Sequence, residues 1–260
     1  MLRSPLALAL LTVSLPACPD SPRGLTVDVP VTAGVAGGAL AVWGVTELAK
    51  GELTPGTCRW CGPPSVDRDV WAGLVWSDPK AAGLLSDVLV LALPASLAGA
   101  DFFFAGRDAR RATEDVLVSM EAVALAAVAT QVVKFTVARR RPAAWAAGLR
   151  TSPDDDRAFF SGHVATAFAA AGAFGTVARL RGYPAWPAVY AVGFGTAAAI
   201  GYLRMAADEH WLSDVVAAAA VGAGLGVAVP LFFHRGGHEE EPTFTPLSGG
   251  VVGLRVSGSL

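Results

Sequence analysis

Residues 215–233 read VVAAAAVGAGLGVAVPLFF, a run of 19 residues without a charged side chain. A second uncharged run, of 22 residues, covers 182–203. About 20 apolar residues in helical conformation cross a bilayer, so both runs are long enough to span one. Apolar stretches at 88–100, 116–134 and 164–178 come close to that length. We therefore predict an all-α fold, a transmembrane bundle of about six helices.

The composition supports this fold class and limits the partners. The chain is 53% hydrophobic and only 16% charged, whereas soluble domains have about 25% charged residues. A net charge of −2 gives no reason to expect a nucleic-acid partner. Alanine and glycine dominate the apolar runs, which would let helices pack closely in a membrane. A large soluble bundle with alanine-rich core helices remains the alternative.

The chain divides into a leader, one helical domain and a tail. We place the leader at 1–18, the domain at 19–235 and a polar tail at 236–260. The tail alternates weakly from residue 249, but we expect it to stay disordered because a lone strand has no partner. The predicted helices cover 31–48, 83–105, 115–138, 162–179, 186–204 and 211–234.

The first 17 residues resemble a bacterial export signal, with one arginine and a short apolar stretch. The residues Leu15, Pro16, Ala17 and Cys18 resemble a lipoprotein processing site, although proline is unusual there. An uncleaved N-terminal helix is the other interpretation.

Basic residues in the loops predict an orientation. Arginines gather in the loops after the second, fourth and sixth predicted helices, at Arg107, Arg110, Arg111, Arg179, Arg181 and Arg235. If these loops face the cytoplasm, the positive-inside rule is satisfied and the remaining loops lie outside. A cleaved leader conflicts with six spans. Either the leader stays as a seventh span, or the segment 31–48 is a surface or re-entrant helix.

Cys58 and Cys61 form a Cys-Arg-Trp-Cys motif in a loop rich in glycine and proline. Two cysteines alone do not complete a tetrahedral zinc site. In an extracytoplasmic loop we expect a local disulfide, with a redox role as the lesser alternative.

Three blocks of polar residues lie beside the apolar runs, where ionisable groups are costly unless they share a charged ligand. The first is Lys134, followed by Arg141 and Pro142. Arginine offers a planar fork and lysine a point charge, and both bind phosphate. The three arginines before Pro142 indicate the frayed end of a helix. Snorkelling of basic side chains at the membrane surface would explain this block equally well.

The second block is Ser161-Gly162-His163, at the start of a predicted helix. Ser161 could cap this helix and leave backbone N–H groups free for an anion. Gly162 would let the backbone approach the anion closely. A capped helix with an incidental histidine is the alternative.

The third block is Arg204, His210 and Asp214. His210 and Asp214 are four residues apart and would be neighbours on one helix face. Asp214 could then accept a hydrogen bond from one imidazole nitrogen and leave the other free to attack. A purely structural His–Asp pair is the alternative.

Together the blocks resemble the type 2 phosphatidic acid phosphatase (PAP2) superfamily, which includes lipid phosphatases, bacterial acid phosphatases and vanadium haloperoxidases. The family pattern is Lys, six residues and Arg-Pro; then Pro-Ser-Gly-His; then Ser-Arg, five residues, His, three residues and Asp. The chain matches it in order and spacing, and the resemblance covers about residues 80–235, the expected catalytic core. It departs where Phe160 replaces the proline and Leu203 replaces the serine.

The resemblance implies a role for each matching residue. His210 would attack phosphorus to form a phosphohistidine, oriented by Asp214. His163 would protonate the leaving alcohol and then activate water. The phosphoryl oxygens would be bound by Lys134, Arg141, Ser161, the backbone of Gly162, and Arg204. No metal or cofactor is required, and we expect the carboxylates of Asp154, Asp155 and Asp156 to be solvated.

The function that follows is a phosphatase for a lipid phosphate or polyprenyl diphosphate, in a bacterial inner membrane with the active site facing the periplasm. A vanadium-dependent haloperoxidase and a non-catalytic phospholipid-binding membrane protein are the alternatives.

Overall fold

The structure is a computed structural model that describes residues 24–236, 243–247 and 251–255. The predicted export signal and Cys18 lie outside the described residues.

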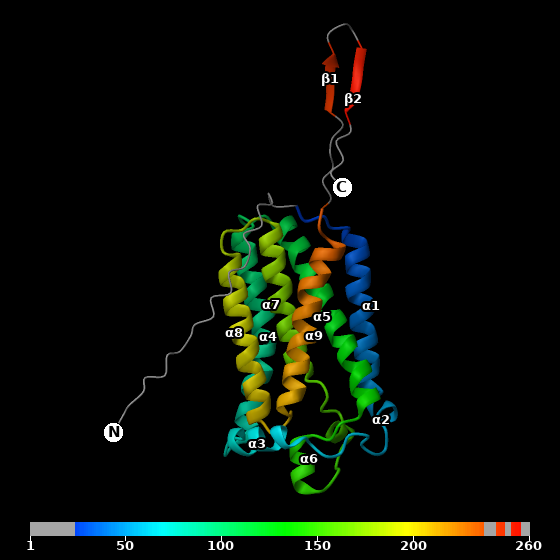
Figure 1. Cartoon of the computed structure of the whole chain (residues 1–260), viewed down its shortest axis with the longest axis vertical. Helices are drawn as coiled ribbons and strands as arrows, with labels where there is room; N and C mark the ends of the chain where they lie inside the picture. Colours follow the sequence, from blue (N-terminus) through cyan, green and yellow to red (C-terminus); the bar gives the residue numbers. More distant parts are fainter. Residues whose placement is uncertain (1–23, 237–242, 248–250, 256–260) are drawn as a thin grey trace, which may run out of the picture.

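Six long helices run side by side along the molecule (Figure 1). All six correspond to predicted helices, so the all-α bundle is confirmed. They are α1 (Val29–Leu48), α4 (Pro79–Phe104), α5 (Ala109–Val137), α7 (Gly162–Leu180), α8 (Trp186–Ala206) and α9 (Leu212–Phe233).

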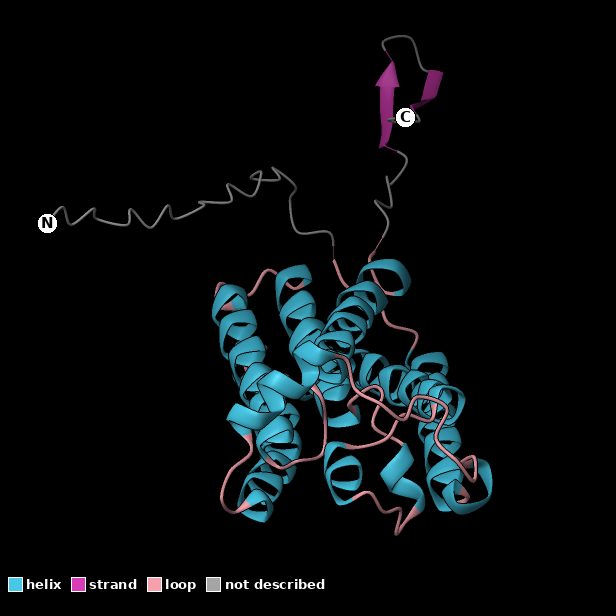
Figure 2. Cartoon of the chain, turned by 60° about the horizontal axis from the view of Figure 1, so that its bottom comes forward, coloured by secondary structure: helices cyan, strands magenta, loops and turns pink. Residues whose placement is uncertain are grey.

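Four short helical segments were not predicted. They are α2 (Lys50–Leu53), α3 (Ser65–Leu74), α6 (Pro142–Ala147) and the 3-10 helix η1 (Pro153–Asp156). Figure 1 places α2, α3 and α6 at one end of the bundle, and Figure 2 shows the loops that cross this end. We refer to it as the loop end, and to the opposite end as the far end.

Aspartate caps explain where three of the long helices begin. Asp28, Asp78 and Asp108 each accept hydrogen bonds from backbone N–H groups in the first turn of α1, α4 and α5. These N–H groups have no partner inside the helix, and a capping carboxylate satisfies them. Because Asp108 caps α5, this helix starts at Ala109, six residues before the predicted start.

Helix α7 forms the centre of the bundle and packs closely against α9. A Cβ atom added at Gly222 would lie 2.2 Å from the carbonyl oxygen of Ala165, and one added at Gly226 would lie 2.4 Å from that of Ala169. Only glycine permits this approach of two helix backbones. The two helices run parallel, since both begin at the loop end (Figure 1).

The outer helices expose apolar surface that suits a membrane. Within the described residues, α1, α4, α5 and α9 are long and apolar enough to cross a bilayer. Large apolar side chains on them point outward, including Leu91, which is 73% exposed, and Phe232, which is 80% exposed. A soluble bundle would cover such a surface. The chain is therefore a membrane protein rather than a soluble bundle.

The ends of the described bundle meet at the far end. The backbone N–H of Gly236 donates to the carbonyl of Gly24 at 2.7 Å, and that of Thr26 donates to the carbonyl of His234 at 2.9 Å. From there α1 runs to the loop end and packs along α5. The segment 31–48 therefore forms part of the bundle, as one of its candidate membrane spans. The loops 105–108 and 181–185, with Arg107 and Arg181, also lie at the far end, opposite the three polar blocks. Arg110, Arg111 and Arg179 lie on the adjoining helix ends.

The prediction for the tail is wrong in one respect. Strands β1 (Thr243–Leu247) and β2 (Val251–Arg255) pair antiparallel, with Thr243 opposite Arg255. The expected lone strand instead has a partner within the tail itself.

Candidate active site

All three polar blocks meet at the loop end of the bundle. The first follows from the last turn of α5, the second from the start of α7, and the third from the end of α8 and the start of α9. Helix direction produces this convergence, because α5 and α8 run toward the loop end while α7 and α9 run away from it (Figure 1).

The first block changes conformation after Lys134. Helix α5 ends at Val137, and Ala138 takes a left-handed conformation with φ 46°. The next residues form an extended segment, in which the N–H of Arg141 donates to the carbonyl of Asp155 at 2.7 Å. Lys134 and Arg141 therefore lie on different structural elements, which confirms that the arginines mark the helix end.

The second block places a buried, unpaired hydroxyl at the start of α7. Ser161 occupies the N-cap position of α7, but its side chain makes no capping hydrogen bond, so the predicted cap is wrong. Its Oγ is buried and has no hydrogen-bond partner among the described residues. A Cβ added at Gly162 would lie 3.8 Å from Nζ of Lys134, so the start of α7 lies over this cation. Helix N-termini bind anions through their free N–H groups.

Ser161→Ala tests whether this hydroxyl serves a ligand or the fold. We expect kcat/KM to fall about tenfold, because one neutral hydrogen bond to a phosphoryl oxygen, of about 1.4 kcal/mol, is lost. The free energy of unfolding should change by less than about 1 kcal/mol, because no protein hydrogen bond is removed. Thermal unfolding in detergent and an activity assay measure the two effects. A destabilised variant with the wild-type rate would show that Ser161 is a structural cap.

His163, on the first turn of α7, has a partner that was not predicted. Its Nε2 lies 2.8 Å from Oδ1 of Asp87 on α4. Asp87 also lies 3.5 Å from Nη1 of Arg204, which in turn donates to the hydroxyl of Ser86 at 3.2 Å. In the sequence, the signal for this contact was the carboxylate of Asp87 near the start of the otherwise apolar predicted helix 83–105.

His210 and Asp214 lie close together, but not as neighbours on a helix. His210 precedes α9, which starts at Leu212, and its Nδ1 is 3.6 Å from Oδ2 of Asp214. This distance exceeds a hydrogen bond. Asp214 instead accepts from the N–H of Trp211 at 2.8 Å and pairs with Arg139.

The surroundings of His210 favour its neutral form. Burial lowers the pKa of His210 well below 6.5, and the positive charges of Arg204, Arg141 and Lys134 lower it further. These charges act on the imidazole because the three cations lie around it. A neutral imidazole has the free electron pair that a nucleophile needs.

Several buried donors in this region lack partners. In the described part of the chain, no hydrogen-bond acceptor meets Nε of Arg141, Nε of Arg204 or Oγ of Ser161, and Nδ1 of His210 is likewise unpaired. Buried polar atoms without partners are rare and costly. We name Lys134, Arg141, Ser161, Gly162 and Arg204 the donor cluster. Its free donors suit a tetrahedral oxyanion.

Glu209 already contacts this cluster and was not predicted. Its Oε2 pairs with Nη1 of Arg141 and lies 3.3 Å from Nη2 of Arg204. The carboxylate therefore neutralises the two arginines that an anionic ligand would bind. A ligand that binds both arginines through these Nη atoms has to displace it, whereas the two Nε atoms remain free.

Glu209→Gln should strengthen anion binding. We expect inorganic phosphate to bind about fivefold more tightly, because a partly exposed ion pair contributes about 1 kcal/mol. Calorimetric titration with phosphate measures the change, and Glu52→Gln, an exposed charge loss on α2, is the matched control. Weaker phosphate binding in Glu209→Gln would show that the carboxylate supports the ligand site.

The two departures from the family pattern are packing residues. Phe160 is 3% exposed and packs with Val164, Ala165 and Ala218, and Leu203 packs with Ala82 and Ala206. Both side chains are apolar and fill apolar space beside the site. Their packing therefore needs no hydrogen-bond partner.

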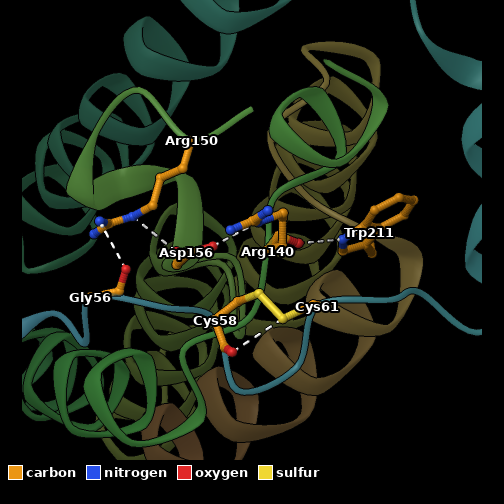
Figure 3. Close-up of a disulfide and its surroundings, with 7 residues drawn as sticks. All are labelled: Gly56, Cys58, Cys61, Arg140, Arg150, Asp156 and Trp211. Atoms are coloured by element: carbon orange, nitrogen blue, oxygen red, sulfur yellow. Dashed lines mark hydrogen bonds and ion pairs between the residues drawn. A yellow bond between two sulfur atoms is a disulfide. The ribbon is translucent and has the colours of Figure 1, made fainter. Parts of the chain in front are cut away.

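The expected disulfide between Cys58 and Cys61 is present and lies at the loop end. Figure 3 shows it beside Arg140, whose Nε donates to Asp156 at 2.9 Å and whose carbonyl accepts from the indole of Trp211 at 2.8 Å. The disulfide loop therefore packs against the segment that carries the first block.

The prediction that the three consecutive aspartates are solvated is wrong. Asp156 is fully buried and pairs with Arg140 and with Arg150, at 3.0 Å. Asp154 pairs with Lys50 at 2.7 Å and with Arg157 at 2.8 Å. Asp155 accepts hydrogen bonds from Thr151 and Ser152 instead. The three carboxylates thus hold the loop end together.

Comparison with known families finds a match for part of the chain. Residues 115–237 match the family model of the PAP2 superfamily. The matched residues contain all three blocks.

Among solved structures, the chain is similar to a transmembrane PAP2 type phosphatidylglycerolphosphate phosphatase from Bacillus subtilis. The two are 18% identical, with a TM-score of 0.44, and the match covers 77% of this chain and 94% of that chain. A comparison with curated proteins finds no match for the chain. These similarities do not assign a substrate.

Proposed function

We propose that the chain is a membrane phosphatase that hydrolyses a lipid phosphate or polyprenyl diphosphate through a phosphohistidine on His210. The observation that carries the proposal is the set of unpaired buried donors on Arg141, Ser161 and Arg204, beside a buried and neutral histidine. A binding protein needs the cations but has no use for a nucleophile.

The geometry suggests how the reaction proceeds. Nδ1 of His210 faces Asp214, so Nε2 would attack phosphorus while the ester P–O bond breaks. His163 would give its proton to the leaving oxygen, and would then take a proton from the water that cleaves the P–N bond. The donor cluster would stabilise the negative charge on the phosphoryl oxygens in both steps.

An apolar groove supports a lipid as the substrate. It lies between α4 and α8, and its lining includes Leu89, Leu93, Leu97, Val189 and Val192. Of the lining residues on α4, Leu89 lies nearest the loop end, and the groove continues from there toward Phe104 at the far end. A lipid tail in this groove would remain in the bilayer while its head group reaches His210.

The orientation follows from the two ends of the bundle. The arginine-rich loops lie at the far end, and the disulfide lies at the loop end with the site. Disulfides persist in oxidising compartments, and basic loops stay in the cytoplasm. We therefore place the site on the periplasmic face of a bacterial inner membrane.

Phosphate release from a substrate panel tests the proposal. The panel contains phosphatidic acid, phosphatidylglycerol phosphate, undecaprenyl diphosphate and a soluble aryl phosphate, each assayed with purified protein in detergent. We expect release of inorganic phosphate from at least one lipid. Lipid binding without release would favour a binding protein, and vanadate-dependent halide oxidation would favour a haloperoxidase.

A further inference from the structure

A buried group of charges lies behind His210, on the side of Asp214. Arg139 is 1% exposed, and its Nη2 pairs with Oδ2 of Asp67 on α3 at 2.5 Å. Its Nη1 pairs with Oδ1 of Asp214 and donates to the hydroxyl of Ser213 at 2.7 Å. None of the three polar blocks includes Arg139 or Asp67.

Asp67 also fixes the start of α9. Its Oδ1 accepts from the N–H of Ser213 at 2.9 Å, and its Oδ2 accepts from the hydroxyl of Ser213 at 2.7 Å. A carboxylate at this place satisfies an N–H group that has no partner within the helix. The first turn of α9, which carries Asp214, is thus held from α3.

Both oxygens of Asp214 are consequently fixed. Oδ1 pairs with Arg139, while Oδ2 accepts from the N–H of Trp211 at 2.8 Å and faces Nδ1 of His210 at 3.6 Å. The direction in which Asp214 faces the imidazole therefore depends on Arg139.

The disulfide loop holds Arg139 from its other side. The ring centre of Trp60 is 3.8 Å from Cζ of Arg139, close enough for a cation–π contact. The N–H of Arg59 donates to the carbonyl of Ala138, and the N–H of Arg140 donates to that of Trp60, both at 3.0 Å. The loop between Cys58 and Cys61 thus lies alongside the arginine segment.

The charges of this group suit a nucleophilic histidine. Two carboxylates, Asp67 and Asp214, surround one guanidinium, so the group carries a net negative charge. Attack by His210 on phosphorus places positive charge on its imidazole ring. A fixed negative charge next to the ring stabilises that state without rearrangement.

We propose that Asp67 and Arg139 are positioning residues for phosphoryl transfer, which hold Asp214 toward His210 with the support of the Cys58–Cys61 loop. The proposal rests on the proposed phosphatase function. Neither Asp67 nor Arg139 belongs to the donor cluster. The proposal therefore predicts that replacing either residue lowers kcat without weakening anion binding.

Asp67→Asn and Arg139→Lys test this separation. We expect kcat to fall about tenfold to a hundredfold, in the range found when groups that orient a reacting residue are replaced. KM and the rise in Tm caused by inorganic phosphate should stay within about twofold of wild type. Arg181→Lys is the matched control, because Arg181 pairs with Asp115 at 2.6 Å at the far end. We expect it to lose stability but keep kcat.

Trp60→Leu is a second, milder variant that keeps every buried charge paired. It should lower kcat about threefold, and reduction of the wild-type disulfide should act in the same direction. If Asp67→Asn folds, wild-type kcat overturns the proposal, as does an equal loss of rate and phosphate binding. If Asp67→Asn does not fold, a wild-type kcat in Trp60→Leu overturns the proposal. A wild-type protein without any phosphatase activity would instead contradict the proposed function.

Discussion

Replacing His210 by alanine is expected to abolish turnover, with kcat reduced by at least about a thousandfold. Loss of a nucleophile in other enzymes costs this much or more, because the remaining groups only bind and polarise the substrate. His210 is 2% exposed, and its burial keeps the imidazole neutral and ready to attack. Phosphate release from the best lipid of the panel measures the effect.

Binding of inorganic phosphate distinguishes a lost nucleophile from a collapsed site. The donor cluster remains in His210→Ala, so the phosphate-induced rise in Tm should persist. His234→Ala is the matched control, because His234 is also buried but pairs with Glu121 at the far end, at 2.7 Å. Wild-type turnover in His210→Ala would mean that another residue is the nucleophile.

Arg204→Lys should have the second largest effect, a loss of about a hundredfold in kcat/KM. Arg204 uses Nη1 for Ser86 and Asp87 and Nη2 for Glu209, while its Nε remains unpaired. A lysine keeps the charge but has a single donor group, so it cannot hold these neighbours and a phosphoryl oxygen together. Loss of one such donor to a transition state costs about a hundredfold in rate.

Arg179→Lys provides the control for Arg204→Lys. Arg179 is exposed at the far end, where its guanidinium stacks on Trp186 at 5.7 Å. It should retain the wild-type rate in the same lipid assay. An Arg204→Lys variant as active as the control would contradict a direct contact between Arg204 and the reacting phosphate.

The long helices could be predicted from the sequence because each depends on its own composition. An uncharged run such as 215–233 is apolar whatever its neighbours are, and α9 covers almost the same residues. Short helices depend on tertiary partners instead. Helix α3 is stabilised by Asp67 with Arg139, and by the indole of Trp71, which donates to Asp208 at 2.6 Å. These pairs join residues that are far apart in the sequence, so the local sequence pattern does not predict them.

The site shows the same difference between features set by the local sequence and features set by tertiary contacts. The blocks around Lys134, His163 and His210 follow from spacing within short segments. The contacts of Asp87 and Glu209 arise only in the folded bundle, where Asp87 of α4 meets His163 of α7 and Glu209, after α8, meets Arg141, after α5. Residues that neutralise or orient the predicted groups therefore emerged only from the structure.

The close approach of α7 and α9 has a consequence for how the protein responds to its lipid environment. Gly222 and Gly226 bring these two backbones together over successive turns, starting near His163 and Asp214. Bilayers of different thickness are accommodated by helices that tilt. Any such tilt must move this pair as a unit, because the two backbones are in direct contact. The distance between His163 on α7 and Asp214 on α9 is thereby insulated from changes in membrane composition.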